Sequence, residues 1–146
     1  MSTAQETQGR TILAWGMLLF LLGLLTGILV PHFAVPRLGL SAHIAGVQNG
    51  LVLLIIGLLW PKLVLGPALL LLARAFSILG MYLLWLALLL CALWSAGRAT
   101  PIAAAGQEAS PAQEMLVQTG LVIGSLAAIA AAALMLWGLC RRRPEG

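Results

Sequence analysis

The sequence predicts an all-α membrane protein in which four transmembrane helices form an up-down bundle, with both termini in the cytoplasm. The first reason is composition: 62% of the 146 residues are hydrophobic and only 8% are charged, whereas soluble domains carry about 25% charged residues. The second is that the apolar residues fall into four runs, each close to the roughly 20 residues that a helix needs to cross the hydrocarbon core. The third is that every acidic residue lies outside these runs, and aspartate is absent.

Prolines and charges mark the ends of the four spans. The first two runs stop directly before Pro31 and Pro61, and proline lacks the amide hydrogen that a continuing helix needs. The third run is long, and we expect Arg74 in its first third to extend its charged end to the interface. The predicted domain is the whole chain, residues 1–146, with spans at about 11–30, 41–60, 67–96 and 115–140 and polar tails at 1–9 and 141–146.

The basic residues predict the orientation, because cytoplasmic loops carry an excess of lysine and arginine. One end of the predicted bundle has six of them: Arg10, Lys62, Arg74, Arg141, Arg142 and Arg143. The other has two, Arg37 and Arg98. We therefore expect both termini to be cytoplasmic, in a bacterial inner membrane. The scattered basic residues do not indicate nucleic-acid binding, and the C-terminal triplet is typical of contact with anionic lipid.

Polar residues in the second predicted span indicate a functional site. His43 shares one helix face with Gly46, Val47 and Gly50, so the surface beside its imidazole is flat and carries few side chains. A planar macrocycle could lie there with His43 as its axial iron ligand, because haem iron can be held by one histidine whereas zinc requires three or four ligands. Asn49 could donate a hydrogen bond into the same cavity. Alternatively, His43 bonds a carbonyl of the first or fourth helix, and the glycines serve only packing.

Other candidate residues have two interpretations each. Arg37 and Arg98 are the bases on the His43 side, and either bind haem propionates or contact lipid headgroups. Tyr82 lies near the middle of the third span, where its hydroxyl needs a partner, either backbone or a group in a catalytic cavity. Trp85 also lies inside this span, away from the membrane interfaces where tryptophan is usual. Cys91 and Cys140 are not candidates, because we expect them to be inert free thiols on opposite sides of the bilayer.

Pairs of glycines four residues apart occur in three spans. They are Gly23 and Gly27, Gly46 and Gly50, and Gly120 and Gly124. Such pairs allow close approach of helix backbones in lipid. They indicate packing within the bundle or self-association, and four short spans have little interior of their own, so we expect a homo-oligomer.

Several stretches resemble one family of small membrane isomerases. They are Pro36-Arg37-Leu38-Gly39-Leu40-Ser41-Ala42-His43, Gly46-Val47-Gln48-Asn49-Gly50 and Gly57-Leu58-Leu59-Trp60-Pro61-Lys62. Together they look like the core of hydroxylaminobenzene mutase, and the His–x–x–Gly–x–x–Asn–Gly portion also resembles styrene oxide isomerase. Shorter pieces that fit are Trp94-Ser95-Ala96-Gly97, Pro101-Ile102-Ala103 and Gln113-Glu114.

The resemblance implies a four-helix enzyme that converts an N-aryl hydroxylamine to an aminophenol, or an aryl epoxide to a carbonyl compound. In the styrene oxide isomerase branch it implies haem b at a trimer interface. His43 would be the axial ligand of a Lewis-acidic ferric iron, and Asn49 matches the family asparagine. The partners implied are the bilayer and a small aromatic substrate.

The chain departs from the family pattern at three positions. Leu84 and Leu88 stand where an asparagine and an active-site tyrosine are expected, and Ala45 replaces an acidic residue that is associated with mutases. Tyr82 could substitute for the missing tyrosine from one turn away. The apolar third span also leaves a different hypothesis open, a non-catalytic membrane protein that binds haem or assembles with a partner.

Overall fold

Four long helices make up most of the molecule. The computed structural model describes residues 3–141, and over that range it contains helices and no strands. The elements are α1 (Thr3–Leu29), η1 (Val30–His32), α2 (Pro36–Leu59), η2 (Trp60–Lys62), α3 (Pro67–Trp94), α4 (Pro101–Ala104) and α5 (Pro111–Cys140). The four long helices are long and apolar enough to cross a membrane. These findings confirm an all-helical integral membrane protein.

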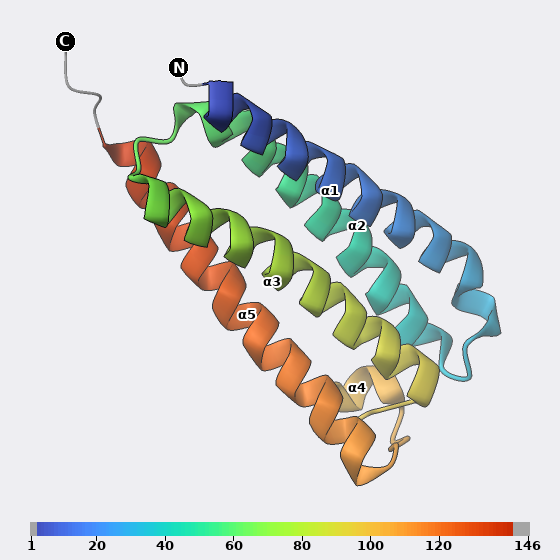
Figure 1. The fold of residues 1–146 in the computed structure, drawn as a ribbon. Helices are drawn as coiled ribbons and strands as arrows, with labels where there is room; N and C mark the ends of the chain where they lie inside the picture. Colours follow the sequence, from blue (N-terminus) through green and yellow to red (C-terminus); the bar gives the residue numbers. More distant parts are fainter. Residues whose placement is uncertain (1–2, 142–146) are drawn as a thin grey trace.

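Successive long helices run in opposite directions, so α1 begins and α5 ends at the same end of the molecule (Figure 1). That this end faces the cytoplasm stays a prediction. The α-helices end at Leu29 and Leu59, and each is followed by a single 3₁₀ turn that contains the proline, Pro31 or Pro61. The predicted stops are therefore confirmed.

Helix α1 begins at Thr3, well before the predicted start at residue 11. Its polar first turns are held by η2 and the residue that follows it: the Gln5 side-chain amide donates to the carbonyls of Trp60 at 2.8 Å and Leu63 at 3.1 Å. The buried indole of Trp60 donates to the Gln8 side chain at 3.2 Å. Hydropathy identified only the apolar part of the helix, because these polar turns are stabilised by tertiary hydrogen bonds.

The helices pack as two antiparallel pairs, α1 with α2 and α3 with α5, joined through the contact of α2 with α3 (Figure 1). Glycines bring the backbones of α1 and α2 together. A Cβ atom added to Gly23 would lie 2.5 Å from the Val47 nitrogen and 2.6 Å from the Gly46 carbonyl carbon. Gly124 has a similar contact, since its added Cβ would lie 3.1 Å from the Leu84 nitrogen. The glycine pairs therefore serve packing within the chain, and their role in self-association stays a prediction.

Candidate functional site

The imidazole of His43 is held by the neighbouring helix. His43 lies in the second turn of α2, about 10 Å along the axis from Pro36, and its side chain is half-buried. Its Nδ1 atom lies 2.8 Å from the carbonyl oxygen of Gly23 in α1. A carbonyl can only accept, so Nδ1 carries the hydrogen, and Nε2 of the neutral ring keeps its lone pair. Of the carbonyl partners that the alternative interpretation allowed, in the first or the fourth helix, the structure shows the one in the first helix. That His43 also binds haem stays a prediction.

This arrangement is compatible with metal binding. A metal-bound histidine commonly donates its other ring N–H to a carbonyl or carboxylate, which fixes the tautomer and the ring orientation. Among residues 3–141, the bond to Gly23 is the hydrogen bond made by the His43 ring, and no group of three or more histidine, cysteine or acidic side chains could hold a metal there. The donor set is thus one imidazole, which suits haem and not zinc.

Gly27 provides the space for this imidazole. A Cβ atom at Gly27 would lie 2.6 Å from Nδ1 and 2.8 Å from Cε1 of His43, far inside van der Waals contact. The sequence indicated that Gly23 and Gly27 form a packing pair. The structure shows that the two glycines have different roles. Gly23 lets the α2 backbone approach and supplies the carbonyl that accepts from His43, whereas Gly27 leaves space for the histidine ring.

Gly46 and Gly50 do not form the flat surface that the sequence predicts for a macrocycle. Both are buried. A Cβ atom at Gly46 would lie 2.6 Å from the Gly23 Cα and 2.8 Å from Cδ1 of Trp85, and one at Gly50 would lie 2.5 Å from the Phe20 nitrogen. Helix α1 and Trp85 therefore cover this face within the chain. A planar cofactor would have to approach His43 from the side of Nε2.

Asn49 and Tyr82 both bond backbone carbonyls of neighbouring helices. The Asn49 amide donates to the Met81 carbonyl of α3 at 3.0 Å. The Tyr82 hydroxyl donates to the Trp15 carbonyl of α1 at 2.9 Å, and the rings of Trp15 and Tyr82 meet edge to face with centroids 5.7 Å apart. Of the two interpretations for Tyr82, the structure shows the backbone one. These side chains hold α1, α2 and α3 in register around the site.

Arg37 and Arg98 lie at the His43 end of the bundle, near the start of α2 and just after α3. Both side chains are exposed, so either could reach an anionic group. Arg98 forms an exposed ion pair with Glu108, at 3.5 Å between Nη2 and Oε2. An exposed pair of this kind contributes little to stability, which leaves Arg98 available to another anion. The structure brings neither arginine into contact with His43.

Glu114 has a structural role, in the loop between α3 and α5, that the sequence did not reveal. It is 3% exposed. Its carboxylate accepts three backbone N–H groups, those of Gly97 at 2.9 Å, Arg98 at 3.1 Å and Ala109 at 2.9 Å. The loop between α3 and α5 is therefore wrapped around one buried charge, which positions Arg98. The sequence feature that could have indicated this role is the acidic residue at the start of the fourth apolar run.

Replacing Glu114 by glutamine is expected to lower the free energy of unfolding by about 3 kcal/mol, because an amide offers one acceptor oxygen and turns its NH₂ group toward backbone donors. Thermal unfolding in detergent measures the change. Glu108→Gln is the matched control, since it breaks only an exposed ion pair and should change stability by less than about 1 kcal/mol. Equal effects of the two substitutions would contradict the role of Glu114.

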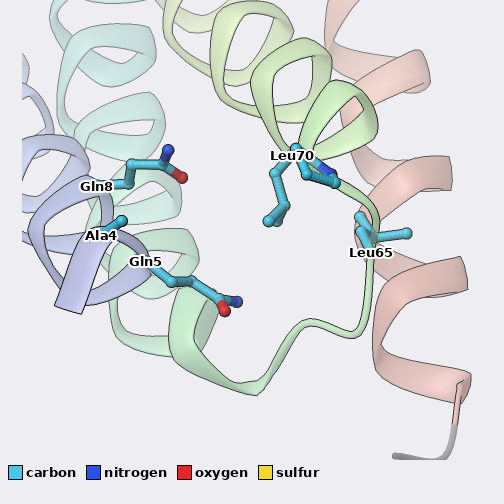
Figure 2. A pocket seen from close by; sticks show the side chains of 6 residues that line it. Ala4, Gln5, Gln8, Leu65 and Leu70 are labelled. Carbon is cyan, nitrogen blue, oxygen red and sulfur yellow. The ribbon is translucent and has the colours of Figure 1, made fainter. Parts of the chain in front are cut away.

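The two cysteines and a hollow near the chain start are not among the contacts of His43. Both cysteines are free thiols, as predicted. The hollow, about 310 Å³, lies at the opposite end of the bundle from His43. Figure 2 shows Gln5 and Gln8 of α1 on one side of it and Leu65 and Leu70 on the other.

Known proteins are similar in sequence to this chain over most of its length. The family model described as styrene oxide isomerase matches residues 8–140. Hydroxylaminobenzene mutase HabB of Ectopseudomonas oleovorans is 50% identical over 131 residues, which cover 89% of this chain and 80% of that protein. Hydroxylaminobenzene mutase HabA of the same organism is 44% identical over 126 residues, covering 86% and 93%. No solved structure matches the chain significantly. The chain therefore belongs to the styrene oxide isomerase family and is an isomerase.

Proposed function

We propose that this protein converts N-aryl hydroxylamines into aminophenols within the membrane, with haem b bound to His43. The observation that carries the proposal is the fixed His43 ring, whose Nδ1 is bonded to Gly23 at 2.8 Å and whose Nε2 keeps its lone pair. The choice of substrate class is supported by the two relatives named hydroxylaminobenzene mutase. Aryl epoxides are the second candidate, supported by the family description.

The residues of this chain would contribute binding and orientation. His43 would hold the iron through Nε2, and bound ferric haem supplies a Lewis acid that can weaken a bond to oxygen. Arg37 and Arg98 are the candidates for its propionates. Gly46 and Gly50 are assigned to helix packing, because α1 and Trp85 cover them. Asn49 and Tyr82 keep the three surrounding helices in place through their bonds to Met81 and Trp15.

The overall reaction needs no second substrate, because a hydroxylamine and its aminophenol contain the same atoms. A small aromatic molecule can also enter from the bilayer, which suits a site on apolar helices. The test is to incubate the detergent-purified protein with hydroxylaminobenzene and to separate the products by chromatography. Formation of aminophenol without added reductant or oxidant supports the proposal. No product from haem-supplied protein would contradict it, and styrene oxide as a parallel substrate distinguishes the two candidate classes.

A homo-oligomer is proposed because α2 carries an exposed glutamine in the middle of its apolar span. Gln48 is exposed, and its neighbours on the same face, Ile44 and Leu51, are exposed as well. An amide in hydrocarbon is stabilised by a hydrogen-bond partner, and a second copy of this chain can supply one. The resemblance to styrene oxide isomerase favours a trimer.

Replacing Gln48 by leucine is expected to weaken this assembly about 3-fold to 30-fold, since an interhelical polar contact contributes about 0.6–2 kcal/mol in a membrane. Analytical ultracentrifugation in detergent measures the dissociation. Gln107→Leu is the matched control, because Gln107 is exposed in the loop before α5, outside the spans. A monomeric wild-type protein, or an unchanged Gln48→Leu oligomer, would contradict the role of Gln48.

A further inference from the structure

The indole N–H of Trp85 is an unpaired donor in the middle of the bundle. Trp85 is 9% exposed. Among the side chains of the described part of the chain, its Nε1 is the one buried nitrogen or oxygen atom without a hydrogen-bond partner. Buried polar groups are nearly always paired, so an exception indicates a functional donor or a ligand that completes it. The rest of the indole packs in the apolar core.

The polar side chains that the sequence singled out in α2 and α3 are all paired. His43, Asn49 and Tyr82 each bond a carbonyl of a neighbouring helix, at 2.8, 3.0 and 2.9 Å. Backbone carbonyls are therefore within reach of this region, yet none of them accepts from Trp85. The indole is the donor that the protein leaves unused.

Gly46 fixes the position of this N–H relative to His43. A Cβ atom at Gly46 would lie 2.9 Å from Nε1 and 2.8 Å from Cδ1 of Trp85, so the N–H edge of the indole faces α2 at Gly46. His43 precedes Gly46 by three residues, which places it on the same helix face about one turn away. The unpaired donor therefore lies against α2 about one helical turn from His43.

We propose that Trp85 is a substrate-binding residue, whose indole N–H donates a hydrogen bond to the oxygen that moves during isomerisation. This inference rests on the proposed function. As the N–O bond of an aryl hydroxylamine lengthens, negative charge develops on that oxygen. A donor already in place and shielded from water stabilises such charge. The absence of a side chain at Gly46 then has two roles: it lets α1 come close to α2, and it lets the N–H edge of the indole come close to α2.

Substitution of Trp85 tests the proposal by the split between kcat and KM. Trp85→Phe is expected to lower kcat for hydroxylaminobenzene roughly 10-fold to 100-fold, with a smaller change in KM, because the bond is strongest in the transition state. Trp137→Phe is the matched control, since Trp137 is 48% exposed and stacks with Arg141 away from this region. It should leave both constants unchanged.

A second variant separates loss of the donor from loss of volume. Incorporating 3-benzothienylalanine at position 85 keeps the bicyclic shape and replaces N–H by sulfur. The same fall in kcat in this variant supports the proposal, and wild-type kcat and KM would overturn it. Absence of turnover in the wild-type protein would instead contradict the proposed function.

A spectroscopic measurement tests the hydrogen bond without turnover. The ultraviolet resonance Raman band that reports indole hydrogen bonding is recorded as the difference between wild-type protein and Trp85→Phe. An unbonded indole is expected in the resting protein, and a bonded one after addition of 2-aminophenol. A band that is already of the bonded type in the resting protein, or one that 2-aminophenol leaves unchanged, would overturn the inference.

Discussion

Replacing His43 by alanine is expected to lower kcat/KM for hydroxylaminobenzene by more than about 100-fold. Loss of a group that merely supports a metal ligand typically costs 10-fold to 100-fold, and His43 is proposed to be the ligand itself. Product formation by purified protein measures the effect. His32→Ala is the matched control, because this other histidine lies in the exposed turn η1.

The outcome against this prediction is specific. If His43→Ala keeps more than about a tenth of wild-type activity while it folds normally, His43 is not the ligand that the proposal requires. If His32→Ala lowers activity as strongly as His43→Ala, the loss of activity is not specific to His43, and the prediction is contradicted.

Replacing Gly27 by alanine is expected to lower activity about 10-fold to 100-fold, the range seen when the group that orients a metal-bound histidine is lost. The added methyl group would lie 2.6 Å from Nδ1 of His43, so the ring must move away from the Gly23 carbonyl that orients it. Overpacking should also lower the free energy of unfolding by about 1–3 kcal/mol. Kinetics and thermal unfolding measured on the same preparation separate these effects.

The matched control for Gly27→Ala is Gly66→Ala. No atom lies within 4 Å of a Cβ at Gly66, and its backbone conformation, with φ −68° and ψ 161°, suits alanine. It should keep wild-type activity. Wild-type activity in Gly27→Ala would show that the bond from His43 to Gly23 is not needed for function.

The sequence predicted the fold well because its signals are local. Four apolar runs of membrane-spanning length and two prolines at their ends are sufficient to place α1, α2, α3 and α5 and the turns at Pro31 and Pro61. The polar extension of α1 to Thr3 was not predictable in the same way, because bonds from Gln5 to Trp60 and Leu63, distant in sequence, hold it.

The sequence predicted which residues belong to the candidate site, but it did not predict how they are arranged. Helical periodicity places His43, Gly46 and Gly50 on one face, but it does not say what covers that face. The structure shows that α1 and Trp85 cover it, so the glycines serve packing. Periodicity also could not identify the carbonyl of Gly23 as the partner of His43, or the space that Gly27 leaves, because both depend on how α1 and α2 cross.

Glu114 illustrates a further limit of sequence reasoning. An acid at the start of an apolar run is usually a marker of the membrane interface. Here its carboxylate is buried and binds the backbone N–H groups of Gly97, Arg98 and Ala109. This role depends on the path of a loop that contains no strong local signal.

The absorption spectrum of the detergent-purified protein, expressed with an adequate supply of haem, tests the central claim most directly. That claim is that Nε2 of His43 binds haem iron while Nδ1 is held by Gly23. A Soret band in the wild-type protein and in His32→Ala, and its loss in His43→Ala, is the predicted result. A colourless wild-type protein, or a band of equal strength and position in His43→Ala, would contradict the account.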